Sequence, residues 1–153
     1  MKNKYNVSRK LLNKFRSNFT ILVVELVIDF GGKILLIKRK EEPLKGQWFI
    51  PGRRICKAED IEKAAVRITK EETGLDCKIV RQLPSSREIY HAKWTEDGLY
   101  DTYGIVFLMK PINKRQKVCI DNTSSGYMFT EKIKSNFDPY LKKILKNSGV
   151  LIL

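Results

Sequence analysis

The chain has 153 residues, of which 42% are hydrophobic and 31% are charged. This length fits one domain with a single sizeable core, and this composition excludes a disordered or fibrous protein. Lys and Arg number 30 against 17 for Asp and Glu, so the formal net charge is +13. Such a surplus favours anionic partners, namely nucleotides, phosphorylated metabolites, nucleic acid or an anionic membrane surface, although a lysine-rich surface can serve solubility alone.

Cysteine and histidine are too few for the common structural metal sites. The three cysteines are scattered without a C-x-x-C pair, which is typical of free thiols in a reducing compartment, and the single His argues against a Cys/His zinc site. The longest apolar run, from Ile21 to Phe30, has about half the length that a bilayer requires and contains Glu25. No secretory signal follows the basic start of the chain. We therefore expect a cytoplasmic protein without a membrane partner.

The chain begins with a basic segment that has helical periodicity. Four apolar residues recur at helical spacing in this segment: Val7, Leu11, Leu12 and Phe15. We expect one domain over residues 1–153, with residues 1–18 as a basic helical extension. The expected role of this extension is packing or contact with a second copy in a homodimer, and binding to a membrane surface is the alternative.

Gly and Pro divide the next part of the chain into short apolar segments. Residues 20–30 and 33–40 flank Gly31 and Gly32, which predicts a β-hairpin. Four further segments have the composition of strands, and they are residues 46–51, 75–80, 86–94 and 102–110.

The remaining segments predict a turn, a loop and two helices. Residues 95–98 predict a turn, residues 121–126 a loop, and residues 137–147 a closing amphipathic helix. Another helix is predicted from Glu59 onward. Strands combined with one central and one terminal helix predict an α/β fold, in which a mixed β-sheet is sandwiched between α-helices.

The central helix poses a question about one carboxylate. A helix that begins at Glu59 and ends with Gly74 as its C-cap carries an apolar stripe, formed by Ile61, Ala64, Ala65 and Ile68. At about 100° per residue, Glu72 falls within roughly 40° of Ile68 and so lies on that stripe. A buried and unpaired carboxylate costs several kcal/mol, and a bound cation removes that cost. The alternative is that Glu72 bends outward at the helix end and pairs with a Lys.

The segment around this helix, PGRRICKAEDIEKAAVRITKEETGL, contains a motif. Six residues follow the pattern G-x5-E-x7-R-E-U-x-E-E-x-G-U, where U is a bulky apolar residue: Gly52, Arg67, Glu71, Glu72, Gly74 and Leu75. The segment resembles the Nudix box, the strand–loop–helix unit of the Nudix hydrolases. Ala58 stands where the first Glu is expected, with Glu59 next to it, and Ile68 replaces the Glu after Arg67.

These departures are similar to those of the GDP-mannose mannosyl hydrolase branch, which reads R-L-T in place of R-E-U. The upstream stretch KRKEEPLKGQWFIPGRR agrees with the same branch, and the similarity covers roughly residues 21–110. The resemblance implies a Nudix-like α/β fold and a hydrolase that uses Mg²⁺, with Mn²⁺ as an alternative ion. It implies that the substrate is a nucleoside diphosphate sugar, GDP-mannose or a related GDP-sugar, cleaved at the sugar C–O bond. Such a reaction needs charge stabilisation on the departing diphosphate and a positioned water.

The resemblance also implies a set of site residues. The implied metal ligands are the Gly52 carbonyl, Glu71, Glu72 and Asn122, and Glu59 would join them only around a second metal. The implied substrate-binding residues are Glu25, Arg39, Arg54 and Tyr103, and the catalytic roles fall to Arg39, Arg54, Tyr103 and Arg67. An Arg suits a diphosphate because its planar fork holds two oxygens at once.

Each of these residues also has a structural interpretation. The two clamp arginines could be surface cations, and Glu25 could lie on the solvated face of an edge strand. Tyr103 could be an ordinary strand residue of the core. Arg67 could pair with Glu71 on one helix face, which would brace the loop rather than contact the substrate.

The general base is missing from its expected place. The branch has a Gln-His pair in a late loop, and the counterpart in this sequence is Asn122-Thr123. Thr123 cannot act as a base near pH 7. His91, the one imidazole in the chain, is the alternative base, or else a structural residue of a strand.

Two other functions stay open from the sequence. A Nudix pyrophosphatase would cleave a P–O bond of another nucleoside diphosphate derivative. A catalytically silent Nudix-fold module would bind a nucleotide or RNA on the basic surface, and the missing carboxylates at 58 and 68 and the missing imidazole at 123 favour this idea. Nucleic acid is nevertheless the less favoured partner.

Overall fold

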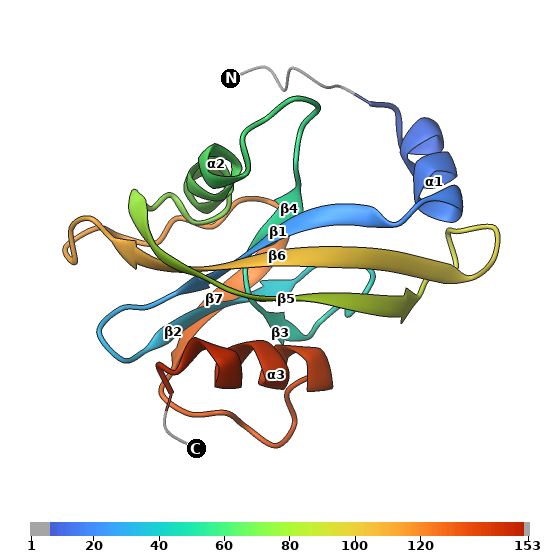
Figure 1. Ribbon diagram of the computed structural model, residues 1–153. Coiled ribbons are helices and arrows are strands. Elements are labelled where there is room, and N and C mark those ends of the chain that lie inside the picture. Colours follow the sequence, from blue (N-terminus) through green and yellow to red (C-terminus); the bar gives the residue numbers. More distant parts are fainter. Residues whose placement is uncertain (1–6, 152–153) are drawn as a thin grey trace.

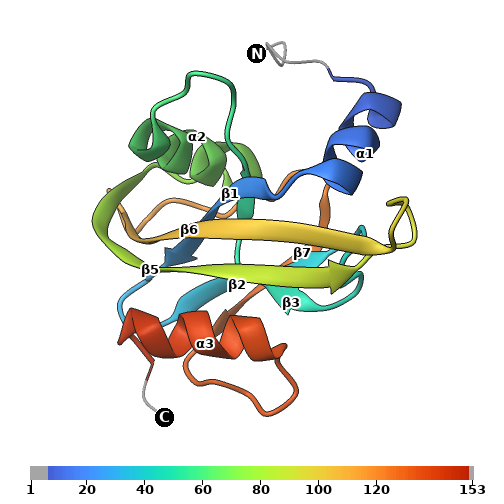
Figure 2. The same cartoon turned by 45° about the vertical axis from the view of Figure 1, so that its right-hand side comes forward.

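The computed structural model describes residues 7–151, and these residues form two β-sheets and three α-helices (Figures 1 and 2). The four-stranded sheet has the order β4-β1-β6-β5, and the three-stranded sheet has the order β3-β2-β7. The strands are β1 (Ile21–Ile28), β2 (Ile34–Arg39), β3 (Trp48–Phe49), β4 (Gly52–Arg54), β5 (Cys77–His91), β6 (Leu99–Pro111) and β7 (Ser124–Thr130). The helices are α1 (Arg9–Asn18), α2 (Ile61–Thr73) and α3 (Pro139–Ser148). The predicted mixed α/β architecture is confirmed, with two sheets rather than one.

Two hydrophobic cores hold these layers together. One core joins the four-stranded sheet to α2 and includes Val24, Leu26 and Ile68. The other lies between the two sheets and α3 and includes Val27 and Leu141. Because successive strand residues point to opposite faces, β1 contributes to both cores. In Figure 1, α1 and α2 accordingly lie above the four-stranded sheet and α3 lies below it.

The helices begin and end at residues that suit those positions. Ser8, Asp60 and Asp138 cap the N-termini of α1, α2 and α3, and each side chain accepts a backbone N–H from the first turn. Gly74 ends α2 with a φ of 72°, as predicted. Because Asp60 is the cap, α2 begins at Ile61 and not at Glu59.

The predicted hairpin around Gly31 and Gly32 is wrong as a pair of strands, although the turn exists. The two glycines have φ of 74° and 93°, and the Gly32 N–H donates to Asp29 Oδ1 over 2.7 Å. Beyond a single bridge between Asp29 and Ile34, however, β1 and β2 belong to different sheets. The reason is that both edges of β1 are occupied, by β4 on one side and by β6 on the other.

Residues 75–80 and 86–94 were predicted as two strands, and both contribute to one long strand, β5. Its pairing with β6 shifts register twice, the second time around Pro84. Such irregularities bend a strand without ending it, so a strand with an internal Pro looks interrupted in the sequence. The predicted turn at 95–98 is confirmed.

The predicted loop at 121–126 is too long, because β7 begins inside it at Ser124. Two Ser and a Gly at the start of β7 have low strand propensity, but the strand pairs along β2. Of the predicted loop, only residues 121–123 lie outside a strand, at the end of the connection between β6 and β7.

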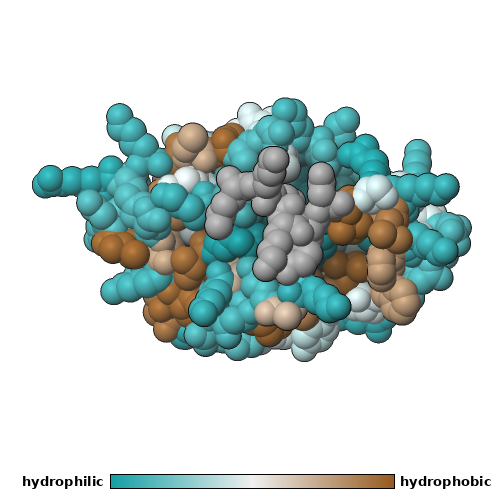
Figure 3. Space-filling model, turned by 90° about the horizontal axis from the view of Figure 1, so that it is seen from above, coloured by the Kyte–Doolittle hydropathy of each residue, from teal (hydrophilic) through white to brown (hydrophobic). Residues whose placement is uncertain are grey.

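Helix α1 covers part of the predicted N-terminal extension, and residues 1–6 lie outside the described residues. Leu11 and Phe15 are exposed on it, and so is Phe19 directly after its end. Figure 3 shows apolar side chains among polar ones on the face that carries α1 and α2. A homodimer contact through this helix stays a prediction. Among the described helices, none has the length and apolar character that crossing a membrane requires.

Candidate metal and diphosphate site

Helix α2 directs Glu72 inward, as its position on the apolar stripe predicts. The residue is 3% exposed, next to the buried Ile68 and Thr69. Its Oε2 accepts the Gly52 N–H over 3.1 Å, and its Oε1 accepts the Arg53 Nε–H over 2.8 Å. The alternative, in which Glu72 bends outward to a Lys, is therefore wrong.

Burial shapes the electrostatics of Glu72. Removal from water raises the pKa of this carboxyl to about 7, because a dry environment disfavours the charged form. Arg53 acts in the opposite direction, and the neighbouring Asp121 adds to the increase. A second cation close to Glu72 would favour its ionised form, which is the property expected of a metal ligand.

Gly52 presents its backbone to the same place. It lies on β4, an edge strand, opposite Glu25 of β1. Its N–H points away from β1 to Glu72, and in extended backbone the carbonyl of the same residue leaves the strand on the same side. A Cβ at this position would lie 2.9 Å from the Val24 carbonyl oxygen and 3.1 Å from Glu25 Cγ. Only glycine fits, so the close approach of backbone to Glu72 depends on it.

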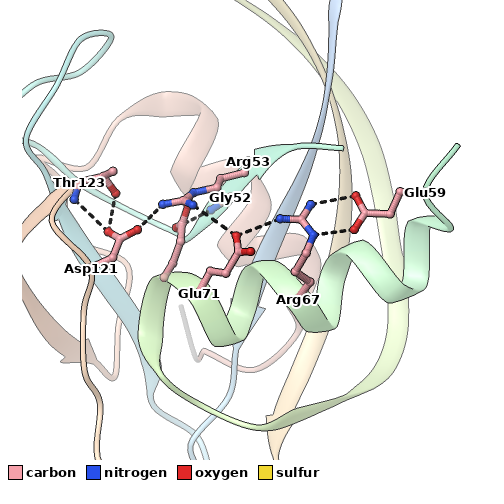
Figure 4. Close-up of polar contacts among 8 residues, drawn as sticks. Gly52, Arg53, Glu59, Arg67, Glu71, Asp121 and Thr123 are labelled. Carbon is pink, nitrogen blue, oxygen red and sulfur yellow. Dashed lines mark hydrogen bonds and ion pairs between the residues drawn. The ribbon is translucent and has the colours of Figure 1, made fainter. Parts of the chain in front are cut away.

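Arg53 is the centre of the carboxylate cluster, and the sequence analysis missed it. Its guanidinium contacts Glu72, Glu71 Oε2 at 3.3 Å and Asp121 Oδ2, so three carboxylates surround one cation (Figure 4). The signal for Arg53 was its place next to Gly52 on a strand, where residues 53 and 54 must point to opposite faces. Asp121 could have been found as the acidic residue beside the predicted ligand Asn122.

A second ion-pair chain runs along α2. Arg67 donates to Glu59 Oε1 over 2.5 Å, to Glu59 Oε2 over 2.8 Å and to Glu71 Oε2 over 2.9 Å. Glu59 also accepts the Cys56 N–H over 2.9 Å, and the hydrogen bonds from Arg67 lower the pKa of Glu59 to about 2. The predicted pairing of Arg67 with Glu71 is thus present, and Arg67 braces the loop before α2.

This pairing corrects the register of the motif. Seven residues separate Glu59 from Arg67, which is the spacing that the pattern requires for its first Glu. Glu59 therefore occupies that position, and the apparent gap at Ala58 is an error of one residue. The same count places the first glycine of the pattern at Arg53.

The loop before β7 brings Asp121 to the cluster in place of Asn122. The Asn122 backbone carbonyl accepts from Lys40 Nζ over 3.3 Å. Thr123 donates its N–H and its hydroxyl to Asp121 Oδ1, over 3.0 Å and 2.6 Å. His91 lies on a strand as expected, exposed at the C-terminal end of β5.

Glu25 is buried on the other face of the sheet. It is 7% exposed and lies on β1 between β4 and β6, so the edge-strand interpretation is wrong. The Tyr140 hydroxyl donates to Glu25 Oε2 over 2.6 Å. Burial raises the pKa of Glu25 to about 7, and the positive charge of Arg39 opposes the increase.

The positive charges of both predicted clamp arginines act on the phenol of Tyr100. Burial raises the pKa of the Tyr100 phenol, and the positive charges of Arg39 and Arg54 oppose this increase. The Arg39 Nε–H donates to the Pro43 carbonyl over 2.6 Å. Arg16 of α1 joins the two arginines, although no pattern in the sequence distinguishes it from the other basic residues. Its guanidinium lies 5.3 Å from the Tyr100 ring centre and 4.8 Å from that of Trp94.

Tyr103 does not belong to this group. It lies three residues beyond Tyr100 on β6, which places it on the opposite face of the strand, and it is 43% exposed. The aromatic residue beside the arginines is therefore Tyr100. Position 103 pairs with Leu22 and Arg87 in the neighbouring strands.

The described residues offer oxygen donors that suit a hard divalent cation, namely three carboxylates and one backbone carbonyl. As they stand, however, no three acidic, His or Cys side chains within residues 7–151 converge closely enough to hold a metal ion. The carboxylates of Glu71, Glu72 and Asp121 instead face the Arg53 guanidinium. The donor chemistry fits Mg²⁺, but in this structure the three carboxylates do not converge on one point.

Comparison with known proteins agrees with the fold and the motif. The NUDIX domain family matches residues 19–139. The chain is 36% identical over 129 residues to the low-salt glycan biosynthesis protein Agl8 of Haloferax volcanii, and the matched residues make up 84% of this chain and 82% of that protein. It is 40% identical over 74 residues to an ADP-ribose pyrophosphatase of Methanocaldococcus jannaschii, and the matched residues make up 48% of this chain and 44% of that protein. A solved MutT NUDIX hydrolase from Burkholderia pseudomallei has a TM-score of 0.69 at 21% identity, and covers 85% of this chain and 98% of that one. The chain therefore belongs to the Nudix family.

Proposed function

We propose that the protein is a Mg²⁺-dependent hydrolase of a nucleoside diphosphate sugar, GDP-mannose or a related GDP-sugar, and that it releases GDP and the free sugar. The observation that carries this proposal is the buried Glu72 carboxylate, bonded to the Gly52 backbone inside a cluster of three carboxylates. Oxygen donors in this number suit Mg²⁺, or Mn²⁺ in its place.

The metal side of the proposed site consists of Glu72, Glu71 and the Gly52 carbonyl, with Asp121 facing the same cluster and Asn122 retained as a proposed ligand beside them. When bound there, Mg²⁺ would offset the negative charge of a departing diphosphate. Glu72 contributes a carboxylate that burial keeps in place, and Gly52 contributes a rigid backbone position on β4. Arg67 keeps the preceding loop in position through Glu59.

The substrate side consists of Arg39 and Arg54, with Arg16 added by the structure. Guanidinium groups bind the oxygens of a diphosphate in pairs and remain charged at any relevant pH. Tyr100 offers a ring and a hydroxyl among these arginines, and we propose it in the place where Tyr103 was expected. Glu25 offers a buried carboxyl that can accept from a hydroxyl or an N–H group of the substrate.

Asp121 is the proposed general base. It is a carboxylate in the late loop where the sequence offered only Thr123, and Thr123 orients it through two hydrogen bonds. A carboxylate can take a proton from a water held beside the sugar carbon, which is the role of the base carboxylate in inverting glycosidases.

The similarity to Agl8, a protein named for glycan biosynthesis, supports a sugar-containing substrate. The similarity to an ADP-ribose pyrophosphatase supports the second candidate, a pyrophosphatase that cleaves a P–O bond. The intact chain from Glu59 through Arg67 to Glu71 also favours that candidate, because the motif keeps these residues at their ordinary spacing.

Hydrolysis in heavy-oxygen water distinguishes the two reactions. GDP-mannose and ADP-ribose are each incubated with the protein and Mg²⁺, and the products are analysed by mass spectrometry. We expect label in the sugar released from GDP-mannose. Label in a phosphate product would overturn C–O cleavage and support the pyrophosphatase. Absence of turnover with either substrate, together with a nucleotide-induced rise in melting temperature, would support a silent binding module.

A further inference from the structure

Arg53 occupies the centre of the proposed metal site, and we infer that it is a resident cation that a divalent metal ion must displace. This inference rests on the metal site proposed above. Its guanidinium faces Glu72 through Nε, Glu71 through Nη1 and Asp121 through Nη2, so every nitrogen of the group is directed at a different carboxylate.

A guanidinium and a metal ion cannot use these oxygens at the same time. Mg²⁺ requires its ligands at about 2.0–2.1 Å from one point, whereas a planar guanidinium holds its acceptors apart around its edge. Among residues 7–151 no three such side chains converge on one point, and in this cluster the guanidinium contacts all three carboxylates. Withdrawal of Arg53 would leave Glu71, Glu72 and Asp121 facing one space.

Arg53 has the freedom to withdraw. Its side chain is 33% exposed, whereas that of Glu72 is 4% exposed and fixed by the Gly52 N–H. The Arg53 backbone is held in β4 opposite Val24, so displacement needs only rotation of a long side chain. Arg53 can therefore leave the cluster while Glu72, the most buried of the three carboxylates, stays in place.

Displacement has two consequences for binding. The metal ion competes with an internal cation for the same carboxylates, so its affinity in the absence of substrate is lowered. The released guanidinium keeps its charge at the edge of the site, where a diphosphate on the metal ion can bind it. Metal and nucleotide should therefore bind more tightly together than separately.

The test measures Mn²⁺ affinity without nucleotide, by calorimetry or by the loss of the free-Mn²⁺ electron paramagnetic resonance signal. Arg53→Gln should bind Mn²⁺ about 10-fold or more tightly than the wild type, because removal of a competing charge strengthens the attraction. Arg54→Gln is the matched control: it removes the same charge from the next residue of the same strand, on the opposite face. We expect it to change the affinity by less than about 3-fold.

An affinity in Arg53→Gln equal to or below that of the wild type would overturn the inference. So would absence of binding in both proteins, and that result would also remove the metal site. Thermal unfolding provides a second readout: Arg53→Gln should melt below the wild type without metal, because three carboxylates lose their counter-ion, and Mn²⁺ should raise its melting temperature more than that of the wild type. Arg53→Lys keeps the charge but loses the fork that faces three carboxylates, so its Mn²⁺ affinity should lie between those of the wild type and Arg53→Gln. Failure of these results while labelled water still marks the sugar would refute the inference and leave the proposed function standing.

Discussion

Two buried glutamates lie on either side of Gly52, and their comparison shows what distinguishes a candidate metal ligand from a buried carboxyl. Glu25 is opposite Gly52 in the strand register, and Glu72 accepts the Gly52 N–H. Burial raises the pKa of both side chains to about 7. By exposure and pKa alone, the two residues are nearly the same.

Their partners differ. Glu25 accepts a neutral hydroxyl from Tyr140, whereas Glu72 pairs with Arg53 in a group that contains two more carboxylates. Negative charges gather around Glu72 because a cation is already there to balance them. A buried carboxylate therefore indicates a metal site only when other oxygen donors accompany it, and three substitutions test this distinction.

The largest effect is expected from Glu72→Gln. The amide keeps the shape but removes the charge that a divalent cation binds, so kcat/KM with the preferred substrate should fall about 10²–10³-fold. Metal-free stability should change by less than about 1 kcal/mol, because the lost Arg53 contact and the removed buried charge oppose each other. Wild-type Mn²⁺ affinity in this variant, measured by calorimetry, would show that Glu72 is not a ligand.

The second effect is expected from Asp121→Asn, which affects only the Glu72 side. If Asp121 is the general base, kcat should fall about 10²-fold even at saturating Mn²⁺. Thr123→Ala removes only the hydroxyl that orients Asp121, so its rate loss should be smaller, about 10-fold. A loss in Asp121→Asn that excess Mn²⁺ restores would make Asp121 a ligand and not the base.

The third effect is expected from Glu25→Gln, and it concerns stability rather than activity. The folded-state pKa of Glu25 is raised to about 7. Its contribution to the free energy of unfolding is therefore fully present below the ordinary pKa of 4.5, and it is lost as the pH rises through 7. Neutralisation by Gln should therefore make the variant more stable than the wild type at pH 8, by up to about 3 kcal/mol, with little difference at pH 4.5. Urea unfolding at both pH values measures this difference.

Glu62 is an exposed residue of α2, and Glu62→Gln is the control for the loss of a carboxylate. This variant should leave the pH dependence of the unfolding free energy unchanged. Mn²⁺ affinity should also stay at the wild-type value in Glu25→Gln. A loss of metal binding there would mean that the two sides of Gly52 are not separate, and the comparison would fail.

The sequence predicted the features that follow from local periodicity. The burial of Glu72 followed from its angle to Ile68 on α2, and the end of α2 followed from Gly74. The separation of β1 from β2 could not be predicted, because it depends on β4 and β6 occupying both edges of β1.

The candidate site was predicted only in part for the same reason. Asp121 reaches Arg53 across 68 residues of sequence, and no local pattern connects them. The grouping of Arg16 with Tyr100 likewise depends on how α1 packs against the end of β6. The resemblance pointed to Tyr103, whereas the aromatic residue beside the arginines is Tyr100. The two residues are three positions apart on one extended strand, so their rings lie on opposite faces.

Gly52 has a consequence for how this protein can change over time. Its N–H serves Glu72 and its missing side chain leaves room for Glu25, so any replacement disturbs both sides at once. The residues beyond it are independent, because Arg53 and Arg54 face opposite ways. If the proposed roles hold, substitutions on the Glu25 and Arg54 side can change substrate preference without altering the Arg53 side, whereas Gly52 tolerates no replacement.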